Sequence, residues 1–139
     1  MSAYWKGRGM NAQPSMGIPD DGGVGLNVRV VAGPGHVVVS VTGDIDMTTE
    51  QAFRDALMRE VAKPARRVVA DLAGVGFMAS QGLRVLLAVN QRLEAAGGSL
   101  VVACVQPVVA RMLSLTGLDE VIPVAGGVAE ALALGQLRK

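Results

Sequence analysis

The stretch from Val68 to Leu87 constrains the fold of this chain more than any other part of the sequence. A short apolar run, residues 68–72, is followed by a glycine-containing connection, residues 73–76. Apolar residues then recur at helical spacing over residues 83–87. An apolar run bounded by turn signals is typical of a buried strand, and the later periodicity is typical of a helix. The stretch therefore predicts a strand, a loop and a helix, with Ser80 in the first turn of that helix.

The rest of the sequence continues this alternation of strands and helices. The expected strands are residues 26–31, 36–41, 68–72, 99–105 and 121–124, and the expected helices begin at Thr48, Ser80, Pro107 and Val128. Ala32-Gly33-Pro34-Gly35 predicts a hairpin turn between the first two strands. Pro123 predicts an edge position for the last strand. The fold class is therefore α/β, a mixed and mostly parallel sheet with an N-terminal antiparallel hairpin and about four helices packed on it.

Length and composition predict one globular domain. The chain has 139 residues, and we expect a flexible tail over residues 1–25 and a domain over residues 26–139. The net charge of +1 gives no electrostatic footprint for nucleic acid. No apolar run approaches the roughly 18 residues needed to cross a bilayer, so a cytoplasmic protein is expected. The single cysteine, Cys104, lies in an apolar run and is expected to be an inert core residue.

Two acidic residues and a helix start lie after the second expected strand. Thr48 and Gln51 fit a capping box for the helix that follows. Asp44 and Asp46 are two residues apart and could contribute to a Mg²⁺ site. They could instead be turn residues whose carboxylates accept hydrogen bonds from nearby N–H groups, and this second interpretation is favoured.

Enzyme signatures are not met. A serine-hydrolase elbow needs glycine two residues before the nucleophile, where this chain has Met78. The only histidine, His36, precedes Ser80, which is the wrong order for that fold. No phosphate loop, dinucleotide fingerprint or His/Cys zinc cluster is present in the sequence. We therefore expect no enzymatic activity, no cofactor and no metal.

Two blocks of the sequence resemble the STAS domain family, and specifically the bacterial anti-sigma factor antagonists. Residues 41–46, Val-Thr-Gly-Asp-Ile-Asp, are similar to the family's Gly-Glu/Asp-Leu/Ile-Asp segment at a strand end. Residues 71–83, DLAGVGFMASQGL, are similar to Asp-Leu-x-x-Val-x-Phe-Met/Ile-Asp-Ser-x-Gly-Leu, which carries a regulatory serine. The spacing of the blocks and the order of elements agree over about residues 26–137.

The resemblance implies a regulatory protein that binds an anti-sigma factor, often also a serine kinase, and thereby releases a sigma factor. Phosphorylation of Ser80 would abolish that binding, and Asp46 matches the family's aspartate near the phosphorylation site. Where the family usually has Asp before the serine, this chain has Ala79, which removes a charge and a hydrogen-bond acceptor. The expected partner-binding residues are Asp44, Asp46, Met47, Thr48, Met78, Ala79, Ser80, Gln81, Gly82 and Leu83.

Several alternatives stay open at this point. Ser80 could be a plain helix cap. Met78 could line the contact surface with Met47 or fill the core, and core filling is favoured for Met78. The function could instead be that of a STAS module that binds a small ligand such as a nucleotide, or of an accessory subunit of a transporter. No nucleic-acid or membrane partner is expected, and the chain should be a monomer or a weak homodimer.

Overall fold

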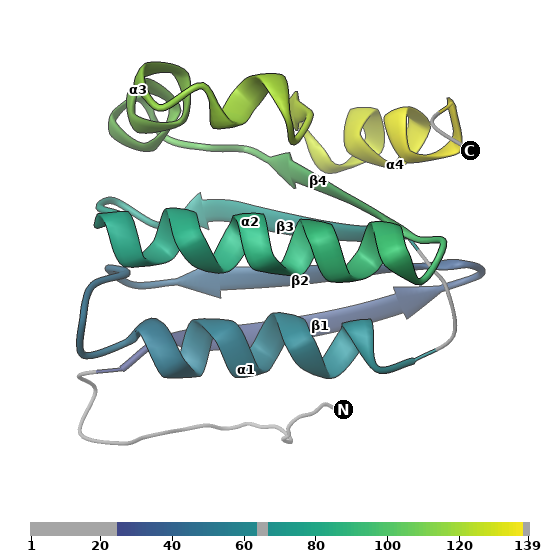
Figure 1. Ribbon diagram of the computed structural model, residues 1–139, viewed down its shortest axis with the longest axis horizontal. Coiled ribbons are helices and arrows are strands. Elements are labelled where there is room, and N and C mark those ends of the chain that lie inside the picture. Colours follow the sequence, from purple (N-terminus) through teal and green to yellow (C-terminus); the bar gives the residue numbers. More distant parts are fainter. Residues whose placement is uncertain (1–24, 64–66, 138–139) are drawn as a thin grey trace.

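The computed structural model describes residues 25–63 and 67–137, which form a five-stranded sheet with helices on both faces (Figure 1). The elements in chain order are β1 (Asn27–Gly33), β2 (His36–Thr42), α1 (Glu50–Val61), β3 (Arg67–Gly74), α2 (Ser80–Ala95), β4 (Ser99–Ala103), α3 (Pro107–Leu115), the 3-10 helix η2 (Leu118–Glu120), β5 (Val124–Ala125) and α4 (Val128–Leu137). The predicted tail, residues 1–25, lies outside the described residues apart from Gly25. None of the described helices combines the length and the apolar character needed to cross a membrane.

The strands lie in the order β1-β2-β3-β4-β5, so the sheet follows the chain. β1 is antiparallel to β2, and the other neighbours are parallel, which confirms the predicted mixed, mostly parallel sheet. The hairpin turn is Pro34-Gly35, as predicted. Proline pre-sets the backbone of the first turn position, and Gly35 adopts a φ of +73°, a conformation that glycine reaches without a steric penalty.

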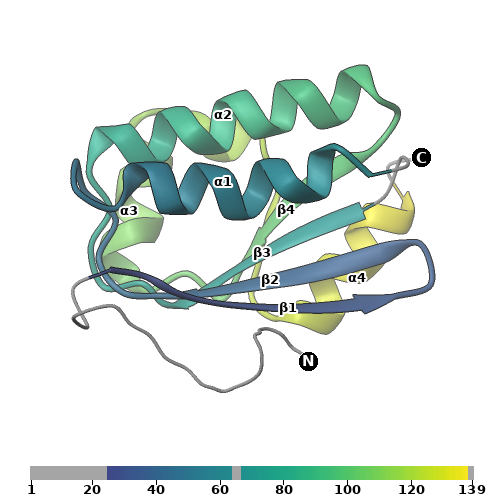
Figure 2. The same ribbon diagram turned by 90° about the horizontal axis from the view of Figure 1, so that it is seen from below.

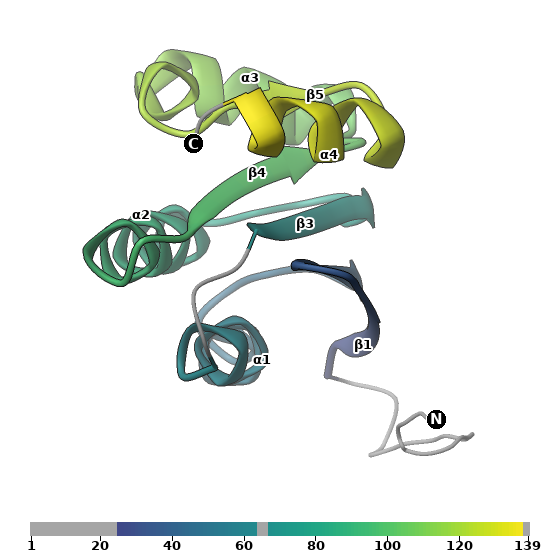
Figure 3. The ribbon, with the colours of Figure 1, turned by 90° about the vertical axis from the view of Figure 1, so that its right-hand side faces the viewer.

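The helices divide the core into two parts. Figures 2 and 3 show α1 and α2 on one face of the sheet and α4 on the other. The larger core joins the inward side chains of β2, Val37, Val39 and Val41, with Phe53 and Leu57 of α1. Their alternation along β2 confirms the predicted period of two, and burying each such side chain contributes about 1.5–3 kcal/mol. A smaller core lies beneath α4 and joins residues of β3, β4 and β5.

The predicted strand at residues 121–124 is wrong at its beginning. Gly117 adopts a φ of +77° and leads into η2, which ends at Glu120. Ile122 is then buried from a loop, and only Val124–Ala125 pair with β4. Within this run Ile122 packs into the core without joining a ladder of strand hydrogen bonds, while Val121 is 49% exposed. The edge position expected from Pro123 is confirmed.

The prediction that Cys104 is a core strand residue is also corrected. β4 ends at Ala103, and Cys104 follows with a φ of +64°, which is uncommon for a residue other than glycine. Its side chain is half-buried at the margin of the smaller core. Burial and the neighbouring carboxylate of Asp71 raise the pKa of the Cys104 thiol, so it stays protonated near neutral pH.

Candidate functional site

Three loops meet at one edge of the sheet, where β2, β3 and β4 end and α1, α2 and α3 begin. We call this the carboxyl edge and define it as residues 43–49, 75–80 and 104–108. It lies on the left of Figure 1. The carboxyl ends of parallel strands are where open α/β sheets commonly place binding sites.

Backbone hydrogen bonds join the two blocks that the sequence analysis singled out. Ile45 N donates to Phe77 O at 2.9 Å, and Ala79 N donates to Ile45 O at 2.8 Å. Ile45 and Met78 thereby form a short parallel bridge beyond the strand ends. The bridge places Asp46, which follows Ile45, beside the segment that leads into α2. Residues more than 30 positions apart in the chain therefore share one surface.

The carboxylate of Asp46 organises the loop before α1. Its Oδ1 accepts hydrogen bonds from Thr48 Oγ1 at 2.7 Å, Thr48 N at 2.9 Å and Thr49 N at 3.2 Å. The Thr48 hydroxyl and backbone, followed by Thr49, hold the pKa of Asp46 below its ordinary value. The interpretation of Asp46 as a turn residue is confirmed. Among the residues described, no group of three His, Cys, Asp or Glu side chains could hold a metal ion.

The predicted capping box is wrong. α1 begins at Glu50, and the side chain of Gln51 reaches forward to Asp55 instead of back to Thr48. The N-cap position is held by Thr49, and the Thr48 hydroxyl donates to the carboxylate of Asp46 instead of capping the helix. The buried Thr49, which sequence reasoning missed, closes the loop: its hydroxyl donates to Asp44 O at 2.8 Å and accepts from Asp46 N at 3.0 Å.

Ser80 is the first residue of α2, and its side chain is exposed. Ala79 occupies the N-cap position with extended backbone, φ −81° and ψ 172°. The interpretation of Ser80 as the helix cap is therefore wrong. Within the described part of the chain the Ser80 hydroxyl has no hydrogen-bond partner, and it lies where the first N–H groups of α2 point outward.

Three of the predicted contact residues lie beneath the surface. Met78 is fully buried, and Gly82 and Leu83 are buried with it. A Cβ at Gly82 would approach Met78 Cγ to 2.6 Å and Ile45 Cγ2 to 2.8 Å, so only glycine lets the first turn of α2 lie this close to the bridge. Core filling, the favoured interpretation of the Met78 side chain, is therefore confirmed. Its place among the expected partner-binding residues is corrected, because that side chain supports the surface from below.

Exposed apolar side chains from all three loops flank this surface. Met47 is 74% exposed, Phe77 47% and Val108 54%. Sequence reasoning named Met47 but missed Phe77 and Val108. Successive side chains of an extended segment point to opposite sides, so with Met78 inside, Phe77 must point outward. Gln106 fixes the third loop to the end of β3, since its Nε2 donates to Ala73 O at 2.8 Å. Asp44, Thr48 and Gln81 complete the rim as exposed or half-buried polar residues.

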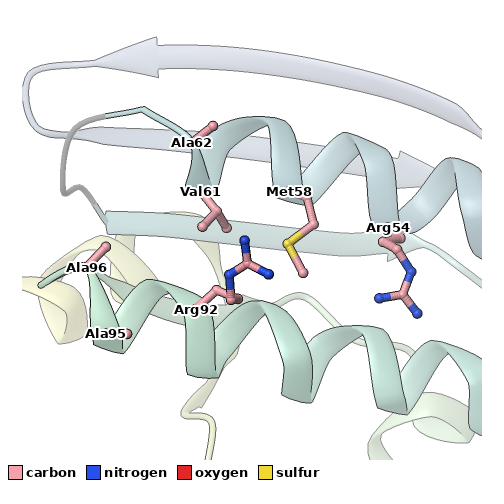
Figure 4. Close-up of a pocket in the computed structure, with 7 residues that line it drawn as sticks. All are labelled: Arg54, Met58, Val61, Ala62, Arg92, Ala95 and Ala96. Atoms are coloured by element: carbon pink, nitrogen blue, oxygen red, sulfur yellow. The ribbon is translucent and has the colours of Figure 1, made fainter.

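A separate groove of about 510 Å³ runs between the later turns of α1 and α2, away from Ser80 (Figure 4). Its floor is apolar, and the side chains of Arg54 and Arg92 approach it from opposite helices. Arg54 pairs with Glu50 at 3.1 Å. The groove is lined by Arg54, Met58, Val61, Ala62, Arg92, Ala95 and Ala96.

Comparisons with known proteins agree on one family. Residues 27–131 match the STAS domain. The anti-sigma-F factor antagonist RsfB of Mycobacterium tuberculosis is 33% identical over 105 residues, which cover 76% of this chain and 82% of RsfB. The crystal structure of an anti-sigma factor antagonist from Mycobacterium paratuberculosis superimposes with a TM-score of 0.73 at 34% identity, covering 80% of this chain and 94% of that one. The phosphorylated form of Bacillus SpoIIAA shares the fold at 18% identity and a TM-score of 0.60, over 77% of this chain and 97% of SpoIIAA.

Proposed function

The chain belongs to the STAS domain family, and we propose that within it the chain acts as an anti-sigma factor antagonist. In this proposal the unphosphorylated protein binds an anti-sigma factor that is also a serine kinase, in the cytoplasm, and so releases a sigma factor. Phosphorylation of Ser80 switches the binding off. The protein itself performs no catalysis.

The state of Ser80 carries this proposal. Its hydroxyl is exposed, is not used by any described residue, and lies at the start of α2, at the end of the loop that presents Phe77 and at the same sheet edge as the loop that presents Met47. A hydroxyl that stabilised its own helix would be engaged in a cap, and this position is held by Ala79. The exposed apolar side chains at the same sheet edge, Met47, Phe77 and Val108, would be removed from water when a protein partner docks, and such residues form the core of protein interfaces.

A phosphate on Ser80 would act on the complex and not on the fold. It would add about −1.5 to −2 charges at neutral pH. The N-terminus of α2 would tolerate that charge, so the domain should stay folded. The nearby carboxylate of Asp46 is already satisfied by Thr48 and Thr49 and offers the phosphate no donor. Docking the same surface would then bury an unpaired dianion. A thousandfold loss of affinity takes about 4 kcal/mol, within the range for unpaired charges at interfaces.

The test combines candidate anti-sigma kinases from the same genome with the protein and ATP. Mass spectrometry should locate one phosphate on Ser80, and titration calorimetry should measure binding before and after phosphorylation. The unmodified protein and Ser80→Ala should bind alike, whereas the phosphoprotein and Ser80→Glu should bind far more weakly. Ser114→Glu is the matched control, since Ser114 is an exposed serine on α3 outside the carboxyl edge. The proposal fails if no such kinase binds the wild-type protein in any state.

The groove between α1 and α2 supports a second candidate function, binding of a small anionic ligand such as a nucleotide. Arg54 and Arg92 could contact phosphate groups above an apolar floor. A thermal-shift screen with nucleotides separates the two functions. Stabilisation by several degrees that Arg92→Ala removes, together with failure to find a protein partner, would favour the ligand-binding module.

A further inference from the structure

The two edges of the sheet are protected to very different degrees. β5 forms one edge with only two residues, follows Pro123, and is contacted by α4. β1 forms the other edge with seven residues, no proline, and Arg29 as its only charged side chain. No described helix or strand lies beyond β1 (Figure 3). Long, open, apolar edge strands are templates for pairing with another chain.

The backbone groups of β1 that face outward can be identified from hydrogen bonds at the two ends of β2. Gly35 O accepts from Arg67 N, and Gly43 N donates to Gly74 O. Backbone groups alternate in direction along a strand, so the odd-numbered residues from 35 to 43 are bonded toward β3. The even-numbered residues of β2 are therefore bonded toward β1. Their partners in the register are Asn27, Arg29, Val31 and Gly33. The N–H and C=O groups of Val28, Val30 and Ala32 consequently point away from the sheet.

This arrangement suits a two-fold axis. Val30 is the midpoint of β1 and is one of the outward-facing residues. Two copies of β1 paired antiparallel about Val30 therefore overlap along all seven residues and in the register that their free groups require. The pairs Val30–Val30 and Val28–Ala32, the latter twice, would form about six main-chain hydrogen bonds.

Side chains also fit this register. Arg29 of one copy lies opposite Val31 of the other, so no like charges are placed directly across from each other. Val28, Val30 and Ala32 lie on the side of the sheet that carries α1, and Val30 remains 39% exposed, so α1 does not cover the strand and leaves room for a second copy. Val31, on the other face, is 55% exposed.

We propose that β1 pairs with β1 of a second copy of this chain, about a two-fold axis at Val30, to form a continuous ten-stranded sheet. The contact is confined to one strand and its flanking side chains, so it falls at the small end of protein interfaces and gives a weak, concentration-dependent dimer. The carboxyl edge loops take no part in the pairing, and each copy keeps its Ser80 surface available.

Sedimentation equilibrium of the full chain tests the proposal without any anti-sigma factor. Val30→Pro removes an outward N–H without removing a bond to β2, and it should weaken the dimer by about tenfold or more. Val31→Glu places a carboxylate opposite Arg29 twice per dimer and should tighten it by about fivefold. Val31→Lys, the matched control at the same position, should weaken it. Circular dichroism and urea unfolding show whether each variant keeps its fold.

Three results would overturn the proposal. The full chain could remain monomeric at several hundred micromolar. It could dimerise with an affinity that none of the three variants changes, in which case another surface forms the dimer. It could also be monomeric as the full chain but dimeric after removal of residues 1–24, in which case the preceding segment covers β1. Because anti-sigma binding and the Ser80 switch are measured separately, none of these results bears on the proposed function.

Discussion

At the scale of single residues, the hydrogen bonds of Asp46 make a prediction about pH. The pKa of Asp46 is lowered chiefly by the Thr48 hydroxyl, so ionised Asp46 stabilises the folded state. That contribution is complete above the pKa of an unfolded-state carboxyl and is lost as the pH falls through the lower folded-state pKa, in the region below about pH 4. Thr48→Val should raise the pKa of Asp46 toward its ordinary value, as measured by NMR titration of the carboxyl carbon.

Thr116→Val provides the control for this titration. The Thr116 hydroxyl also donates a hydrogen bond, but to the backbone of α3 and not to a carboxylate, so its loss should leave the Asp46 midpoint unchanged. Equal midpoints in wild type and Thr48→Val would show that the Thr48 hydroxyl does not stabilise the ionised form.

Sequence reasoning identified which residues lie near the site better than it identified which of them are exposed. Asp46, Met47 and Ser80 lie on the surface as expected, whereas Met78 is buried and Phe77, which was not named, is exposed. The burial of Met78 and the outward position of Phe77 depend on the bridge between Ile45 and Met78, a tertiary contact that the local pattern around residue 78 cannot reveal. Thr49 was missed because its importance comes from Asp44 O, five residues earlier.

At the scale of elements, the start of α2 lacks a side-chain cap, and this can be corrected by mutation. Ala79 has the extended backbone of an N-cap residue but offers no acceptor. Ala79→Asp should supply one to the N–H of Gln81, since Gly82 N already donates to Ala79 O, and place a negative charge at the positive end of the helix dipole. Urea unfolding should show a gain of about 1 kcal/mol.

Ala95→Asp is the matched control for the cap, because Ala95 is exposed at the opposite end of the same helix. There the new charge meets the negative end of the dipole and should lower the stability slightly. If Ala79→Asp and Ala95→Asp changed the free energy of unfolding in the same direction, capping would not explain the effect.

The elements themselves were largely predictable, because their signals are local. β2, α3 and α4 begin where alternation, Pro107 and the last apolar run place them, and the mixed sheet follows from the order of elements. The start of α1 and the run at residues 121–124 were not. In both, a tertiary or loop interaction overrides a local signal: the Asp46 turn takes the place of the capping box, and the core buries Ile122 from a loop.

At the scale of the whole molecule, the sheet brings three separate loops to one edge, where we propose the contact surface. The ends of β2, β3 and β4 lie side by side, and each is followed within a few residues by one exposed apolar side chain, Met47, Phe77 or Val108. The parallel arrangement of β2, β3 and β4 places all three of these residues at the same edge of the sheet as Ser80. The larger core beneath them holds the loops in place through buried residues such as Met78.

This division between contact and support can be tested with three truncations. Met47→Ala and Phe77→Ala should each weaken binding of the proposed anti-sigma partner by about tenfold or more, if these two side chains are among the few central anchors that carry most of the energy of an interface. Neither should change the free energy of unfolding by more than about 0.5 kcal/mol, since both side chains face solvent in the free protein.

Met78→Ala should do the opposite: it opens a cavity in the core and should cost about 2–5 kcal/mol of stability, as measured by urea unfolding. If Met47→Ala and Phe77→Ala left affinity unchanged while Leu115→Ala, at an exposed residue on the far end of α3, reduced it, the partner would dock away from the carboxyl edge, and a charge at Ser80 could not control binding by direct exclusion.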